Sequence, residues 1–120
     1  MNQRPQDLRD RLLRFIVRVI RIGEALPKTP EAQQIRKQMF DASSSTGANY
    51  SEACAAESAL DFVHKMQVVL KELRETHFWL HLIVAAQMLP LSRMQEVLKE
   101  SDELIRIFVT SINTARRKRR

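Results

Sequence analysis

The sequence predicts an all-α protein, an up-and-down antiparallel four-helix bundle formed by one domain over residues 1–120. Only two glycines and four prolines interrupt the 120 residues, and an aromatic content of 6% is low for a sheet. Four amphipathic stretches separated by short connections also follow one another along the chain, as in a bundle of this topology. The expected helices span about 7–26, 30–56, 59–88 and 93–115, followed by a basic C-terminal arm, 116–120.

The first expected helix carries one apolar stripe. Its apolar residues recur at spacings of three and four, which places them on one helix face. They are Leu8, Leu12, Phe15, Val19, Ile22 and Leu26. Asp7 lies in the first turn, where the helix dipole favours negative charge, and Pro27 ends the helix.

The second expected helix begins at Pro30, with Thr29 as its N-cap. Its first half directs Ile35, Met39 and Phe40 inward. It continues through SSSTGANYSEACAAES, residues 43–58, in which twelve of sixteen residues are Ser, Ala, Gly, Thr or Cys. The alanines favour a helix, and small side chains let a neighbouring helix approach closely. The alternative for this stretch is a solvated serine-rich loop.

The third and fourth expected helices also have start signals. Ser58 with Asp61 resembles an N-cap and a first-turn acid, and Ser92 with Gln95 forms a capping box after Pro90. The apolar residues of both helices recur at helical spacing and are expected to face inward. They are Phe62, Met66, Val69, Leu73, Leu80 and Ile83 in the third helix, and Val97, Leu104, Phe108 and Ile112 in the fourth.

The stretch FWLHLIVAAQML, residues 78–89, is apolar on nearly every side of its helix. It is too short to span a bilayer. A helix that is apolar all round has to be covered all round, which favours a contact between subunits of a homo-oligomer. The alternative is burial inside a single bundle. The expected interface residues are Phe78, Trp79, Leu82, Ala86 and Leu89.

A formal net charge of +6 favours acidic partners, with nucleic acid first. Arginines spaced three, four and three fall within an arc of about 80° on the first helix and extend over roughly 15 Å. They are Arg11, Arg14, Arg18 and Arg21. Such a row suits successive phosphates, because each guanidinium can hold phosphate oxygens in a bidentate way. The alternative is a solvated face whose arginines pair with acids on a neighbouring helix.

The C-terminal RRKRR is the second basic feature. We expect a flexible arm that adds salt-dependent affinity for RNA or DNA, formed by Arg116, Arg117, Lys118, Arg119 and Arg120. The alternative is a helix end whose cations complement the dipole. No aromatic residue is interleaved with these five basic residues, so the sequence favours backbone binding over base stacking there.

Several polar residues are candidates for a chemical site. Antiparallel pairing places Glu52 level with His64, which predicts a structural hydrogen bond between them rather than a catalytic pair. His77 and His81 lie one turn apart, and Asp61 with His64 forms one Asp-x-x-His, but the repeated Glu-x-x-His of di-metal bundles is absent. No glycine-rich phosphate motif occurs either. We therefore expect no catalytic residues, no metal, no cofactor and no small-molecule substrate.

Residues 45–83 resemble the signature of the four-helix-bundle proteins encoded in intervening sequences of bacterial 23S ribosomal RNA. The likeness lies in the patterns G-A-N-x-x-E-A, A-E-S-x-x-D-F-x-H-K, K-E-x-x-E-T and W-L. They match at Gly47, Ala48, Asn49, Glu52 and Ala53, at Ala56, Glu57, Ser58, Asp61, Phe62, His64 and Lys65, and at Lys71, Glu72, Glu75, Thr76, Trp79 and Leu80. The chain departs from the family at Tyr50 and Ser51, where members usually carry Ile and a basic or small residue.

The resemblance implies a bundle that assembles into a ring, most often a pentamer, without established enzymatic activity. A more distant relative is the accessory protein of diversity-generating retroelements, a basic ring that binds nucleic acid and its reverse transcriptase. The expected function is a non-enzymatic, homo-oligomeric nucleic-acid-binding protein; the alternative is a protein-interaction scaffold that uses the apolar surface of the third helix. A single cysteine and a start without a signal peptide favour a cytoplasmic location and no membrane partner.

Overall fold

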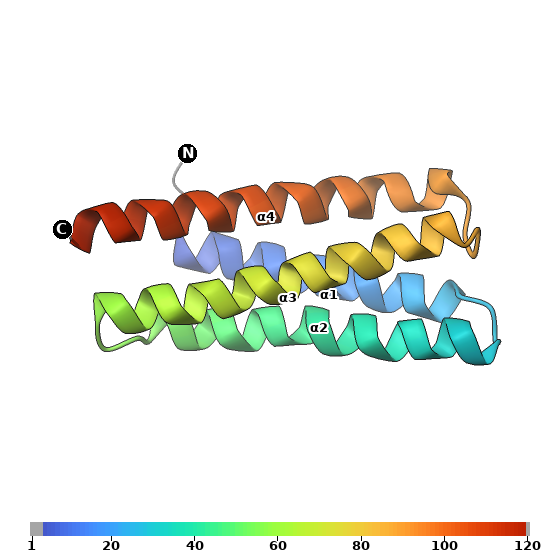
Figure 1. The fold of residues 1–120 in the computed structure, drawn as a ribbon, viewed down its shortest axis with the longest axis horizontal. Coiled ribbons are helices and arrows are strands. Elements are labelled where there is room, and N and C mark those ends of the chain that lie inside the picture. The colour runs from blue at the N-terminus through green and yellow to red at the C-terminus, as the bar shows by residue number, and fades with distance from the viewer. Residues whose placement is uncertain (1–3, 120) are drawn as a thin grey trace.

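The structure, a computed structural model, describes residues 4–119, and this range contains four helices and no strand. They are α1 (Pro5–Ala25), α2 (Pro30–Cys54), α3 (Ala59–Ala85) and α4 (Leu91–Arg119). Each helix runs antiparallel to the one before it, which gives an up-and-down bundle (Figure 1). The prediction of an all-α protein with four helices is confirmed.

Two predicted N-caps are present. The Thr29 hydroxyl accepts a hydrogen bond from the Ala32 N–H at 3.2 Å, and the Ser58 hydroxyl accepts one from the Asp61 N–H at 3.0 Å. Ser58 has to be extended to cap α3, with φ −146° and ψ 162°, so α2 cannot run directly into α3. The helix α2 ends at Cys54, two residues before the predicted end at 56, and 55–58 form the connection.

The start and end of α4 also differ from the prediction. The helix begins at Leu91, directly after Pro90, so the expected capping box at Ser92 and Gln95 lies inside the first turn and does not cap it. At its other end the helix continues past residue 115 to Arg119. Four of the five residues expected to form a flexible arm are therefore the last helical turn, and Arg120 lies outside the described residues.

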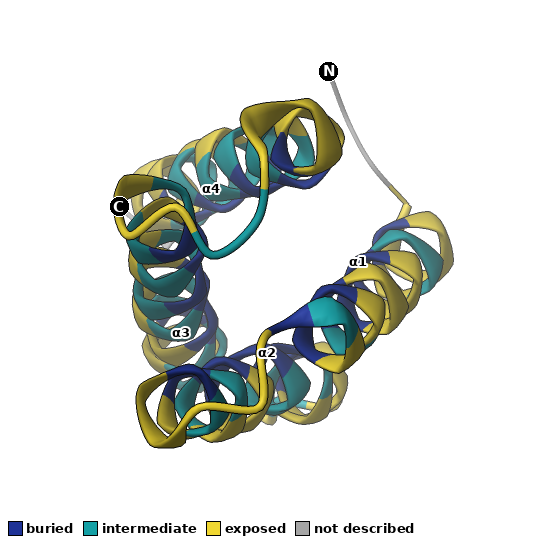
Figure 2. Cartoon of the chain, turned by 90° about the vertical axis from the view of Figure 1, so that its right-hand side faces the viewer, coloured by how far each residue is buried: buried dark blue, intermediate teal, exposed yellow. Residues whose placement is uncertain are grey.

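The core extends along the whole bundle, on the side of each helix that faces its neighbours (Figure 2). All the predicted inward residues of α1 and α4 are buried. In α3 only Phe62 is half-buried instead of buried. Phe40 of α2 was wrongly placed inside, because Met39 occupies the core with no exposure and the next residue points about 100° away. Phe40 is 44% exposed.

The small-residue stretch is helical as far as Cys54, and its small side chains allow close packing. Ser43 and Thr46 are fully buried, and their hydroxyls donate to the carbonyl oxygens of Phe40 and Ser43 at 3.3 and 2.6 Å. A Cβ atom on Gly47 would lie 3.2 Å from Ile16 Cδ1 of α1, which is closer than ordinary packing. The α1–α2 interface therefore uses the absence of a side chain at Gly47.

A Schellman motif ends α3, with Gln87 at the position where glycine is usual. The Met88 N–H donates to the Ile83 oxygen and the Gln87 N–H to the Val84 oxygen, both at 3.0 Å. Gln87 has φ 57°, in the left-handed region. Gln87→Gly is expected to raise the free energy of unfolding by about 1 kcal/mol, because glycine has no Cβ to strain this conformation. Urea unfolding checks this, and Gln87→Ala, which keeps the Cβ, should show no such gain.

Candidate nucleic-acid interface

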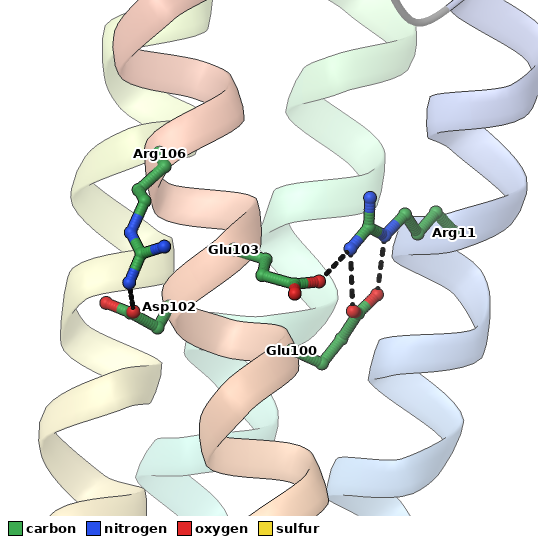
Figure 3. Close-up of polar contacts among 5 residues, drawn as sticks. All are labelled: Arg11, Glu100, Asp102, Glu103 and Arg106. Carbon is green, nitrogen blue, oxygen red and sulfur yellow. Dashed lines mark hydrogen bonds and ion pairs between the residues drawn. The ribbon is translucent and has the colours of Figure 1, made fainter. Parts of the chain in front are cut away.

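The arginine row of α1 faces a row of acids on α4. Arg11 Nε and Nη2 each lie 2.8 Å from an oxygen of Glu100, and Nη2 also lies 2.6 Å from Glu103 Oε2 (Figure 3). The side chains of Arg11 and Glu100 are only 21% and 22% exposed. We call Arg11, Glu100 and Glu103 the Arg11 cluster.

Electrostatics in the Arg11 cluster favour the charged forms of Arg11 and Glu100. The hydrogen bond from Arg11 lowers the pKa of Glu100 below its ordinary value, against the opposing effect of burial. The same hydrogen bond raises the pKa of Arg11. The guanidinium of Arg11 is therefore already occupied by two carboxylates, and it acts as an intramolecular link rather than as a free phosphate ligand.

The other three arginines of the row are more exposed. Arg18 Nη1 lies 3.7 Å from Glu96 Oε2 on α4, and Arg21 Nη1 lies 3.0 Å from Glu24 Oε1 on its own helix. Arg14 has no carboxylate within salt-bridge distance among the described side chains. The structure thus divides the predicted row. The intramolecular alternative holds at the part-buried Arg11, Arg18 and Arg21 form exposed ion pairs, and Arg14 has no carboxylate partner among the described residues.

The last turn of α4 is an exposed cationic surface. Arg116, Arg117 and Lys118 are all exposed, and none has a carboxylate partner within the described part of the chain. The Arg117 Nη2 group donates only to the Thr114 hydroxyl, at 3.3 Å. This turn lies at the end of the bundle where α1 begins (Figure 1). The placement of the Arg119 side chain is not described.

The residues expected to form a subunit contact on α3 lie in different environments. Trp79, Leu82 and Leu89 are partly buried and pack against the core of their own bundle. The Trp79 indole N–H also donates to Glu75 Oε2 at 3.3 Å. Phe78 is 57% exposed, and Ala86 is exposed at the end of α3. Neighbouring helices thus cover part of this surface, and Phe78 is its main exposed apolar side chain.

The predicted hydrogen bond between Glu52 and His64 is wrong. Both side chains are exposed, and Glu52 Oε1 instead lies 3.5 Å from Lys65 Nζ. On α3 the neighbouring Val63 and Met66 occupy the inward positions. A shift of one residue turns a side chain by about 100° around a helix. His64 therefore points outward.

His77 and His81 form a hydrogen-bonded pair. His77 Nδ1 lies 2.8 Å from the buried Ser101 hydroxyl of α4, and His77 Nε2 lies 3.0 Å from His81 Nε2. Burial and the nearby His81 lower the pKa of His77, although Asp102 acts in the opposite direction. Within residues 4–119 no three His, Cys, Asp or Glu side chains come together in a metal-binding group. The pair thus connects α3 to α4.

A further basic surface was missed by sequence reasoning. His64, Lys71, Arg74 and Phe78 lie on α3, on the side opposite the buried Met66, Leu73 and Leu80, and all four are exposed. We call these four residues the α3 outer face. The recurrence of His64, Lys71 and Phe78 every seven residues is the sequence signal that could have revealed it.

Comparisons with known proteins agree with this architecture. A family model described as "23S rRNA-intervening sequence protein" matches residues 6–110. The chain is similar to a protein of unknown function from the S23 ribosomal protein family of Bacteroides thetaiotaomicron. Its crystal structure has 28% sequence identity and a TM-score of 0.81, and the match covers 88% of this chain and 97% of that one. No protein of curated function matches the chain.

None of the described helices has the length and hydropathy that a membrane span requires.

Proposed function

Because the chain belongs to the 23S rRNA-intervening sequence protein family, we propose that it is a non-enzymatic, homo-oligomeric protein that binds the backbone of RNA or DNA. The family description refers to 23S rRNA, which favours RNA as the first partner to test. The binding would be independent of base sequence, since cations that contact phosphates carry no sequence information.

The observation that carries this proposal is the cationic last turn of α4. Three exposed cations at Arg116, Arg117 and Lys118 have no carboxylate partner among the described residues. Their charges cannot be explained as internal ion pairs, whereas the charge of Arg11 can. A row of unneutralised cations is the electrostatic requirement for counterion release from a nucleic acid. Arg14 and Arg18 of α1 would add a second contact region.

Self-association is supported by apolar side chains that the bundle leaves uncovered. Leu13 and Val17 of α1 are 50% and 48% exposed, and they lie one turn apart on the side away from the core. Nearby, Ile20 of α1 and Phe40 of α2 line the same open groove. Contiguous exposed apolar surface is typical of contacts between proteins. A ring, with the pentamer as the size implied by the family, would repeat each basic surface and raise the avidity for a long nucleic acid.

The proposal is tested by the salt dependence of RNA binding. Fluorescence anisotropy with a labelled single-stranded RNA at 50–300 mM salt should give an affinity that falls linearly on a log–log plot. Arg116→Gln/Lys118→Gln should weaken binding and reduce the slope by about 1.4, because each phosphate contact on a single strand contributes about 0.7. An affinity that does not change with salt would reject the proposal.

The matched control is Lys28→Gln/Arg93→Gln. It removes the same charge from exposed positions at the opposite end of the bundle, where α2 and α4 begin. Binding should be close to that of the unmodified protein. Equal losses in the two variants would mean that net charge, not the end of α4, determines affinity. Light scattering after nuclease treatment should give the same multiple of 14.0 kDa for all three proteins.

A further inference from the structure

The α3 outer face combines cations with an exposed aromatic ring. His64, Lys71 and Phe78 follow one another at two-turn intervals, and Arg74 lies one turn before Phe78. Phe78 is the second most exposed of the large apolar side chains, at 57%. The face therefore extends for about 21 Å along the outside of the bundle, given a rise of 1.5 Å per residue.

The cations of this face are not neutralised by the protein. Among the described residues, neither Lys71 nor Arg74 has a carboxylate within salt-bridge distance. Glu75, which follows Arg74, accepts the indole N–H of Trp79 at the edge of the face. Glu72, which follows Lys71, forms no ion pair with it at salt-bridge distance. By contrast, Lys65, just beside the face, pairs with Glu52 and Asp61 at 3.5 and 3.8 Å. An extended anionic ligand is the partner that Lys71 and Arg74 fit.

The ring of Phe78 is held in place by its neighbour. Its centroid lies 5.1 Å from that of Trp79, with an angle of 70° between the planes, which is an edge-to-face contact. Such contacts fix the orientation of a ring and contribute about 0.5–1.5 kcal/mol. An exposed, oriented aromatic ring beside cations is the arrangement on which unpaired bases stack in proteins that bind single strands.

We propose that the α3 outer face binds single-stranded nucleic acid, with an unpaired base stacked on Phe78 and the flanking phosphates held by Arg74 and Lys71. The inference rests on the proposed function but adds a preference: paired bases are stacked on each other and cannot cover Phe78. It also assigns Phe78 to the nucleic acid rather than to a subunit contact.

The test uses Trp79, the single tryptophan of the chain, as a reporter. A 12-nucleotide single-stranded RNA, the matching single-stranded DNA and the blunt RNA duplex are titrated while the fluorescence of Trp79 and the affinity are measured. Both single strands should quench Trp79 and bind more tightly than the duplex. Phe78→Ala should weaken single-strand binding about 5- to 150-fold and leave duplex binding unchanged.

Two further variants separate stacking from a contact between proteins. Phe78→Leu keeps an apolar side chain but loses the aromatic ring, so it should bind single strands as poorly as Phe78→Ala. Leu91→Ala is the control, since it removes an exposed apolar side chain from the start of α4 and should not change affinity. Lys71→Gln/Arg74→Gln should lower the salt slope by about 1.4.

Three results would overturn the inference: unchanged single-strand affinity in Phe78→Ala, equal affinity for duplex and single strand, or full binding by Phe78→Leu. A fall in assembly mass with Phe78→Ala, measured by light scattering, would instead assign Phe78 to a contact between copies. If the variant at the end of α4 weakens binding while all α3 variants bind normally, the proposed function stands and this inference fails. If no nucleic acid binds at all, both fail.

Discussion

Phe108→Ala is expected to lower the free energy of unfolding by about 3–5 kcal/mol, the usual cost of removing a buried phenylalanine ring. Phe108 has no exposed surface and lies at the centre of α4. Its ring meets that of Tyr50 of α2 edge to face, with centroids 5.7 Å apart and planes at 81°. The substitution would leave a cavity between α2 and α4 and remove this aromatic contact.

Urea unfolding followed by circular dichroism measures this loss. Phe78→Ala is the matched control, because the same atoms are removed from a ring that is largely exposed, and the expected loss is at most about 1.5 kcal/mol, the value of its edge-to-face contact with Trp79. Similar losses in the two variants would contradict the placement of Phe108 in the core.

Tyr50, the partner of Phe108, also connects α2 to the start of α1. Its hydroxyl donates to the Pro5 carbonyl oxygen at 3.3 Å, and burial, followed by the neighbouring Cys54, raises its pKa. The resemblance to the family identified this position as a departure, with Tyr in place of the usual Ile. The structure gives the departure a physical role, since a tyrosine can bury its ring and still satisfy its hydroxyl.

Arg11→Ala is expected to lower the free energy of unfolding by about 2–3 kcal/mol, the upper part of the range of about 1.5–3 kcal/mol for one hydrogen bond to a charged group, because bonds that share one guanidinium do not add. The change removes three such bonds and leaves Glu100 and Glu103 next to each other without a cation. Arg14→Ala, on the same side of α1 but without a carboxylate partner among the described residues, is the control and should change stability much less.

The pH dependence of unfolding provides an independent check on the Arg11 cluster. Arg11 lowers the pKa of Glu100 below its ordinary value of 4.5, so below that pH the unfolded chain binds the proton more readily. The stabilisation is therefore complete above about pH 4.5 and is lost as the pH falls through the lowered pKa. The stability of Arg11→Ala should depend less on pH in this window. If the free energy of unfolding changed with pH in the same way in Arg11→Ala and in the unmodified protein, the role of the cluster would be contradicted.

Hydrophobic periodicity was sufficient to predict the four helices and most of the core. Each stripe has to face inward in a bundle, so the buried residues of α1 and α4 could be assigned from spacing alone. Periodicity failed at Phe40, where two adjacent apolar residues competed for one inward position. Met39 is fully buried and Phe40 is exposed, and only the packed structure distinguishes the two.

The polar contacts were less predictable, because they depend on the register between helices. Local caps such as Thr29 and Ser58 need only three residues of sequence, and both were found. The partner of Glu52 depends on which side chains of α3 lie beside α2, and the structure pairs it with Lys65, the residue after the predicted His64. The partners of Arg11 lie 89 and 92 residues away, and no local pattern identifies them.

That separation has a consequence for how the chain folds. The contacts of α1 with α2, of α2 with α3 and of α3 with α4 each join neighbours along the chain, whereas α1 and α4 pack least closely together and are linked by the Arg11 cluster. Closing a loop of 89 residues costs more chain entropy than forming any hairpin of adjacent helices. We therefore expect the first and last helices to join after the hairpins of adjacent helices have formed, and we expect salt or acid to weaken this closing step most.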